Sequence, residues 1–321
     1  MIDVMGFDNP CMDFLCNLPH MPRPNEGMYM KGQSWQGGGQ VATGIVAAAR
    51  LGATTALCGT VGDDIFGRFC RNDLARHGVD VSGLKMQNGC QTGLSLVLSD
   101  EETGGRSILM RQGDAPGLPL EEVKADRIRQ AKVLHVAWVD DVVLKAARIA
   151  KENGVPVLLD ADNYHSRLEE IFPYVDVVIA SKFVYDHYFP SGDEEKNLET
   201  TLSWGPSVAI YTLGDQGCMG LWEKGFFRQE AFPVQVVDTV GAGDVFHGAY
   251  ACCMARGMTP VEAARFASAV SAIKCTRIGG RAGIPTWETT KYFLETGEIL
   301  GKELDERVDF YARGLEYVAE K

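Results

Sequence analysis

The chain has 321 residues, of which 45% are hydrophobic and 23% charged, a composition typical of a globular protein with a large core. Its 31 Lys and Arg against 43 Asp and Glu give a formal net charge of -12, which argues against nucleic acid or an anionic membrane surface as a partner. The acidic N-terminal segment does not resemble a signal peptide, no apolar stretch is long enough to span a bilayer, and the nine cysteines form no CxxC pair, so we expect a cytoplasmic protein with reduced thiols.

Short apolar runs alternate with helical patterns along the chain. Residues 2–7 predict a strand, and residues 39–52 predict an alanine-rich helix that ends at Gly52. A strand with a turn at 54–62 and a helix at 64–78 follow, and the alternation returns between residues 132 and 214. Buried strands separated by helices predict an α/β sandwich, with a mostly parallel sheet covered on both faces.

Two segments, 27–39 and 93–113, break this rhythm with extended, alternating patterns, and residues 101–105 form a plausible turn inside the second. We expect them to pair into a small sheet that acts as a lid; the alternative is that they are edge strands of the main sheet. The predicted core then comprises residues 1–13, 40–92 and 114–321, and the predicted lid residues 14–39 and 93–113.

Near the C-terminus, apolar residues recur every three or four positions and predict one amphipathic helix, which we expect to pack on its own domain rather than in a dimer contact. These positions are Leu304, Val308, Tyr311, Leu315 and Val318.

The stretch "DTVGAGDVFHGAY", residues 238–250, places Gly241, Ala242 and Gly243 at the start of a helical pattern. The amides of a helix's first turn have no intrahelical acceptor, and small side chains let an anion approach them. Asp244 follows directly, and we expect the helix dipole to hold it ionised. An anion cradle beside a carboxylate suits phosphoryl transfer, with Asp244 accepting a proton from a hydroxyl. The alternative is that Asp244 only stabilises the dipole and the glycines only allow close packing.

These residues resemble the C-terminal signature of the ribokinase-like (PfkB) carbohydrate kinases. "GGGQVATGIVAAARLGATTALCGTVGDDIFG" resembles the family's N-terminal signature, and "TLGDQGC", residues 212–218, its nucleotide loop. The resemblance covers the chain up to about residue 300. Within the family, it is greatest to the sulfofructose kinases and their fructokinase-like neighbours. It implies an ATP-dependent kinase with a ribokinase-like three-layer sandwich and a β lid.

The resemblance also implies roles for individual residues. Asp244 would be the catalytic base and residues 241–243 the anion hole. Sugar would be bound by Asp13, at the end of the first strand, and by the following residues: Gly38, Gly39, Gln40, Thr43 and, on the lid, Arg111. The nucleotide would lie against Thr212, Gly214, Gly217 and Cys275.

The implied cofactors are ATP and Mg²⁺. Asp238 and Thr239, together with backbone around residues 275–283, match a loop that in relatives can hold a monovalent cation such as K⁺; Asp238 could equally be an N-terminal cap. The expected partner is a small sugar, with a homodimer through the lid as a further option.

Two departures from the family pattern bear on activity. The N-x-x-E that orders Mg²⁺ in relatives is replaced by Ser181, Lys182, Phe183 and Val184, and the aspartates at 160 and 162 are candidate replacements. Thr43 stands where Asn is usual, which keeps a hydrogen-bonding group but can shift selectivity. His247 is expected to be packed or close to the nucleotide, and His135 to be a hydrogen-bonded core residue.

The substrate is left open by the sequence. Met28 stands where sulfosugar enzymes carry Lys, although Lys31, Arg106 and Arg111 could meet an anionic sugar if they are not simply a solvated lid face. A nucleoside kinase remains an alternative, with Tyr29, Trp35 and Trp138 as aromatic platforms. A sugar-binding relative that has lost catalysis is a third reading, motivated by the altered N-x-x-E.

Overall fold

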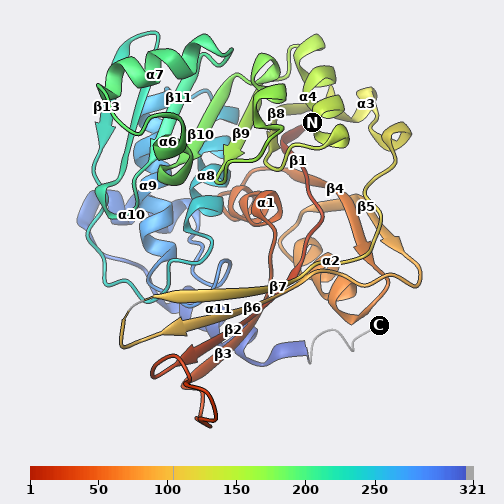
Figure 1. Cartoon of the computed structure of the whole chain (residues 1–321), viewed down its shortest axis with the longest axis vertical. Helices are drawn as coiled ribbons and strands as arrows, with labels where there is room; N and C mark the ends of the chain where they lie inside the picture. Colours follow the sequence, from red (N-terminus) through yellow and green to blue (C-terminus); the bar gives the residue numbers. More distant parts are fainter. Residues whose placement is uncertain (104, 316–321) are drawn as a thin grey trace.

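A nine-stranded, mostly parallel sheet forms the centre of the molecule (Figure 1). The computed structural model describes residues 1–103 and 105–315. The strand order is β13-β12-β11-β10-β9-β8-β1-β4-β5, and its neighbouring pairs are parallel except for β11–β12 and β12–β13, which are antiparallel. The strands are β1 Ile2–Phe7, β4 Thr55–Gly62, β5 Asp80–Gln87, β8 Ala131–Val136, β9 Val157–Ala161, β10 Val177–Ser181, β11 Val208–Thr212, β12 Cys218–Trp222 and β13 Gly225–Gln229.

Helices cover both faces of this sheet, because successive strand residues such as Val4 and Met5 point into two different apolar clusters. One face carries α1 Gln40–Arg50, α2 Ile65–Arg76, α8 Ala242–Ala255 and α9 Pro260–Lys274. The other carries α3 Ala125–Ile128, α4 Asp141–Glu152, α5 Leu168–Ile171, α6 Lys182–Tyr188 and α7 Glu194–Ser203. The remaining elements are α10 Trp287–Thr296, α11 Lys302–Ala312, and the 3₁₀ turns η1 Leu120–Glu122, η2 Phe172–Tyr174 and η3 Gly214–Gln216.

Helices α1 and α8 cross so closely that their backbones are in contact. A Cβ atom at Gly248 would lie 2.0 Å from the carbonyl oxygen of Gly44. This close approach requires glycine at position 248, and it places the N-terminus of α8 beside that of α1.

A separate four-stranded sheet has the order β3-β2-β6-β7 and lies at the lower edge of the molecule in Figure 1. Its strands are β2 Met12–Leu18, β3 Gly32–Gly37, β6 Leu94–Asp100 and β7 Arg106–Arg111. The expected fold class is therefore confirmed, and the two irregular segments are not edge strands of the main sheet. The exact division into core and lid stays a prediction. The placement of Asp13 at the end of the first strand was wrong, because Asp13 lies within β2, paired with Ser95 of β6.

The C-terminal helix α11 buries Leu304 and Tyr311, two positions of the predicted stripe. The Tyr311 hydroxyl donates to Asp73 of α2 (2.8 Å), and α11 also contacts β3, where Gly314 just beyond the helix lies against Trp35. The helix thus ties the small sheet to the large unit rather than packing on one of them. Val318 lies outside the described residues.

In the described part of the chain, no helix combines the length and apolarity needed to cross a membrane. All nine cysteines are free thiols, and most are buried, as expected for packed cysteines. The cytoplasmic location stays a prediction.

Candidate active site

The N-terminus of α8 forms an open cradle of backbone amides. Its cap residue Gly241 has a φ of 72° and offers no side chain to the first turn. A Cβ atom at Gly241 would lie 2.8 Å from the Cα of Gly280, whereas one at Gly243 would meet no atom within 4 Å. Position 241 therefore needs glycine for the turn, and position 243 leaves the amides approachable by an anion.

Asp244 stands in the first turn of α8, next to these amides. Burial raises its pKa well above the usual value, and repulsion from Asp160 raises it further, while His247 acts in the opposite direction. Burial and the neighbouring carboxyl therefore act against the stabilisation that the helix dipole gives to the ionised form of Asp244, and the ionised state of Asp244 stays a prediction. A carboxylate with a raised pKa is the stronger base, as a proton acceptor requires.

Asp160, at the end of β9, is 3% exposed, and neither of its oxygens has a hydrogen-bond partner among the described residues. Burial raises its pKa, with further contributions from Asp162 and Asp8. His247 lies beside it, with Nδ1 3.4 Å from an Asp160 oxygen and 2.6 Å from the carbonyl of Gly243. His247 is buried, as expected, and connects Asp160 to the cradle.

His135 is also buried, and its ring stacks with that of His247 at 6.3 Å between centroids. Neither ring nitrogen finds a hydrogen-bond partner within the described chain, so the expected hydrogen-bonded core histidine is wrong in that respect. Burial, and then the neighbouring His247, lowers its pKa to about 3, so the ring is neutral.

The two residues before α1, Gly38 and Gly39, must be glycines because a carboxylate lies against each of them. A Cβ atom at Gly38 would lie 2.4 Å from a carboxylate oxygen of Asp13, and Gly39, with a φ of 99°, would place one 2.7 Å from Asp8. Asp8 in turn accepts from the amide of Ala42 at the start of α1 (2.9 Å). Burial raises the pKa of Asp13 to about 6, against the opposing charge of Arg281.

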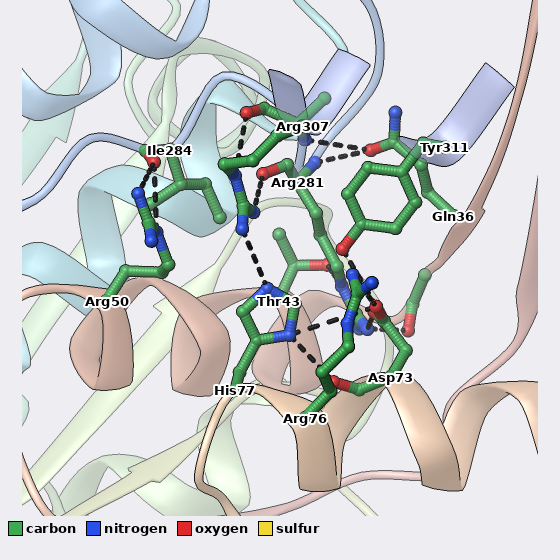
Figure 2. A network of polar contacts seen from close by, with 12 residues as sticks. Gln36, Thr43, Arg50, Asp73, Arg76, His77, Arg281, Ile284, Arg307 and Tyr311 are labelled. Atoms are coloured by element: carbon green, nitrogen blue, oxygen red, sulfur yellow. Dashed lines mark hydrogen bonds and ion pairs between the residues drawn. The ribbon is translucent and has the colours of Figure 1, made fainter. Parts of the chain in front are cut away.

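Arg281 joins α1, α2, β3 and the backbone at Gly38; its contacts with Gln36, Thr43 and Asp73 are drawn in Figure 2. Its fully buried guanidinium donates to Asp73 (2.8 Å), to the carbonyl of Gly38 (3.0 Å) and to the hydroxyl of Thr43 (3.4 Å). Its amide donates to Gln36 of β3 (2.6 Å). The Thr43 hydroxyl therefore faces Arg281, and this arginine also holds the backbone at Gly38.

The nucleotide motif forms the turn between β11 and β12. A Cβ atom at Gly217, which has a φ of 82°, would lie 2.0 Å from the carbonyl of Gln229, so this glycine shapes the turn. Gly214 faces open space. Thr212 ends β11 with its hydroxyl 3.4 Å from the carbonyl of Ala180. Cys275 is buried at the end of α9, and its carbonyl accepts from the amides of residues 237 and 238.

The loop at Asp238 and Thr239 is filled by the protein itself. The Asp238 carboxylate accepts from the amides of Val240 (2.9 Å) and Gly279 (2.8 Å), so it orders the loop but does not cap α8. The ammonium of Lys274 donates to the carbonyls of Asp238 (2.9 Å) and Val240. Because these oxygens already bind a cationic group, the residues present do not fit a monovalent metal ion.

Mg²⁺ has to be tested against the altered N-x-x-E segment. Ser181 caps α6 and Lys182 pairs with Asp186, so neither offers a carboxylate to the site. No cluster of three metal-binding side chains occurs in residues 1–103 and 105–315. Mg²⁺ takes one or two protein carboxylates and otherwise phosphate and water oxygens. The unpartnered carboxyl of Asp160, with Asp162 nearby, fits that requirement.

The basic lid residues have protein partners. Arg106 donates to the Thr239 hydroxyl (2.6 Å), Arg111 to Gln91 and to the carbonyl of Thr92, and Lys31 pairs with Glu101. Of the aromatic platforms, Trp35 already stacks on Phe14 at 4.0 Å. The three basic side chains and Trp35 are thus engaged within the chain, whereas Tyr29 and Trp138 are exposed.

Sequence reasoning missed Asp8, Lys274 and Arg281. Asp8 directly follows the first strand, where parallel sheets place their functional side chains, so its position was a usable signal. Lys274 continues the buried stripe of Phe266 and Val270 on α9, which is unusual for a lysine. Nothing in the surrounding "GGRAG" distinguishes Arg281.

Comparison with known proteins identifies the family of the chain. The profile of the pfkB family carbohydrate kinases matches residues 1–287. Ribokinase of Haemophilus influenzae is 28% identical over 306 residues, which cover 92% of this chain and 98% of that protein. Fructokinase-2 of Solanum lycopersicum is 29% identical over 323 residues, or 92% of this chain and 96% of that protein. The structure of Arabidopsis thaliana ribokinase complexed with ribose and ATP has a TM-score of 0.78 at 23% identity, over 92% of this chain and 99% of that one.

A three-layer sandwich with a small second sheet, a glycine cradle and a half-buried carboxyl beside it, together with the match to the family profile, define an ATP-dependent carbohydrate kinase. Because the family profile spans most of its length, the chain belongs to the pfkB family of carbohydrate kinases.

Proposed function

We propose that this enzyme transfers the γ-phosphoryl group of ATP to a primary hydroxyl of a monosaccharide or a sugar derivative. The observation that carries the proposal is Asp244, a half-buried carboxyl of raised pKa set directly behind an uncapped helix N-terminus. The match to ribokinases and fructokinases supports a sugar as the acceptor.

In the proposed reaction the sugar lies between Asp13 and Asp244 and beside Gly38, Gly39 and Gln40, while the buried Thr43 supports this site through its contact with Arg281. Asp244 accepts the hydroxyl proton, the sugar oxygen forms a bond to the γ-phosphorus, and the bond from that phosphorus to the β-phosphate oxygen breaks, so that ADP leaves with the electron pair. The amides of residues 241–243 bind the charge that develops on the phosphoryl oxygens. We place Arg111 at the rim of the sugar site, where its contacts order Gln91 and Thr92.

The nucleotide would lie against Thr212, Gly214, Gly217 and Cys275. Mg²⁺, held by Asp160 and Asp162, would neutralise the phosphate charge when bound. A cation there would also stabilise the ionised form of Asp160, which burial and the neighbouring carboxyls disfavour.

We also propose a homodimer through the lid. Strand β7 is an edge strand whose residues are all exposed, including Ile108, Leu109 and Met110. An unpaired apolar edge of this kind is normally covered in a stable protein, and a second copy of the same sheet offers a matching edge.

ADP formation from Mg-ATP, measured across hexoses, pentoses, sugar acids, sulfosugars and nucleosides, tests the proposed reaction. Turnover with one sugar class would support it and select the substrate. Sugar binding without turnover at saturating Mg-ATP would contradict it and favour a relative that has lost catalysis.

A further inference from the structure

The helix α9 holds the loop that leads into the anion cradle. Ser271 donates to the carbonyl of Ala242 (2.8 Å), and one turn later Lys274 donates to the carbonyls of Asp238 (2.9 Å) and Val240. The Cys275 carbonyl accepts from the Asp238 amide (3.1 Å). The path of residues 237–242 is therefore set by side chains and backbone at the end of α9.

Lys274 is an unusual residue for this position, since its side chain is 0% exposed. A buried ammonium is costly unless its charge is compensated. Burial lowers the pKa of Lys274, and the nearby carboxylate of Asp238 opposes that shift. Two carbonyl dipoles and one carboxylate thus surround the ammonium, which is also the environment that binds a small monovalent cation.

The loop of residues 237–242 leads into the anion cradle and also contacts the small sheet. Val240 packs with Leu15 and Val97 of that sheet, and Thr239 accepts from Arg106 of β7. If the ammonium were removed, the carbonyls of residues 238 and 240 would lose their donor. The loop that presents the amides of residues 241–243 would then lose its anchor.

We propose that the ammonium of Lys274 takes the place of a bound monovalent cation, so that this kinase needs no K⁺ to order its anion cradle. Lys274 is in this view a positioning residue, since it acts through the loop and does not touch the substrates. The effect on turnover rests on the proposed function, whereas the occupancy of the loop by the ammonium does not.

The first test uses the wild-type protein in choline chloride and in potassium chloride at equal ionic strength. We expect the same melting temperature and, with the identified sugar, the same turnover in both salts. A melting temperature or a turnover that rises with K⁺ and saturates would overturn the proposal, because it would reveal a cation site that Lys274 does not fill.

The second test compares Lys274→Ala with Lys274→Met. Both remove the charge, but alanine also leaves space for an ion. In choline we expect turnover to fall on the order of tenfold or more in both variants, because the cradle is displaced. K⁺ or ammonium ion should restore turnover in the alanine variant, and raise its melting temperature by roughly 2 °C or more, but should do neither in the methionine variant.

Ile273→Ala is the matched control, since Ile273 is the preceding buried residue of α9 and belongs to a purely apolar cluster. It should lose stability without any response to K⁺. An alanine variant of Lys274 that responds to K⁺ no more than this control would overturn the proposal. If no sugar is phosphorylated in any salt, the proposed function fails, but the melting temperatures still decide the role of Lys274. If Lys274→Ala does not fold, the wild-type salt comparison decides alone.

Discussion

The carboxyl group of Asp13 has a pKa of about 6, because burial raises it above the usual value and the Arg281 charge only partly offsets that effect. The group is therefore ionised above about pH 6 and protonated below it. An ionised carboxylate is the better acceptor for sugar hydroxyls. We expect kcat/KM for the sugar to fall as the pH decreases through about 6.

The same shift makes a prediction for stability. Protonation of Asp13 stabilises the folded protein at low pH, and that stability is lost as the pH rises through about 6. Asp13→Asn should therefore raise the melting temperature at pH 7.5 while raising KM on the order of tenfold or more. A variant that melts earlier than the wild type at pH 7.5 would contradict burial as the cause of the shift.

Gly38 tests the close approach at the sugar site. Gly38→Ala would place a methyl group 2.4 Å from an Asp13 oxygen, so the carboxylate must move. We expect weaker sugar binding with little change in ATP affinity, measured by calorimetry. Gly117→Ala is the control, since a Cβ atom there meets nothing within 4 Å. Equal sugar affinities in the two variants would contradict the account.

At the scale of the elements, Asp73 links α2 to α11 and to the loop that carries Arg281. It accepts from Arg281 and from Tyr311 at 2.8 Å each. Burial alone would raise its pKa, but His77 and Arg281 lower it to about 2. Its ionised form therefore contributes about 2 kcal/mol above pH 4, and this is lost as the pH falls toward 2.

Asp73→Asn should cost roughly 3–5 kcal/mol at pH 7, because it leaves the buried guanidinium without its counter-charge. Urea unfolding measures this loss. Asp126→Asn is the control, since Asp126 pairs with Arg129 on the surface and should cost at most about 1 kcal/mol. Similar losses in both variants would show that the buried network does not stabilise the fold.

Helices and strands with a clear hydrophobic period were predictable from the sequence. Strands whose position depends on pairing with segments far away in the chain were not. The helix at 40–50 and the parallel strands followed from their patterns, whereas β2 was missed because its pattern is irregular and its partners, β3 and β6, come later in the chain. The contiguous glycine motifs revealed the cradle. Arg281 could not be found in this way, because it meets Asp73 from 208 positions away.

Electrostatic effects between residues far apart in the chain could not be predicted from the sequence either. Asp244 could be placed at a helix N-terminus, but its raised pKa depends on burial and on repulsion from Asp160, which lies on β9. Likewise, the loop at Asp238 matched a cation site, and the lysine that fills it became visible only when α9 was packed against the loop.

At the scale of the whole molecule, the exposed edge strand β7 predicts a dimer. Its residues Leu109 and Met110 are 54% and 80% exposed. Light scattering should give the mass of two chains for the wild type, and the double variant Leu109→Lys, Met110→Lys should be monomeric with its melting curve largely unchanged, because surface substitutions cost little stability. A monomeric wild type at micromolar concentration would contradict the proposed interface.

The central claim is that Asp244 accepts the proton of the sugar hydroxyl. The most direct measurement is ADP formation by the wild type and by Asp244→Asn with the sugar that the substrate panel selects, combined with calorimetric binding of that sugar. We expect turnover to fall by about a hundredfold or more in the variant while sugar affinity is largely kept. Turnover close to that of the wild type would show that another group is the base.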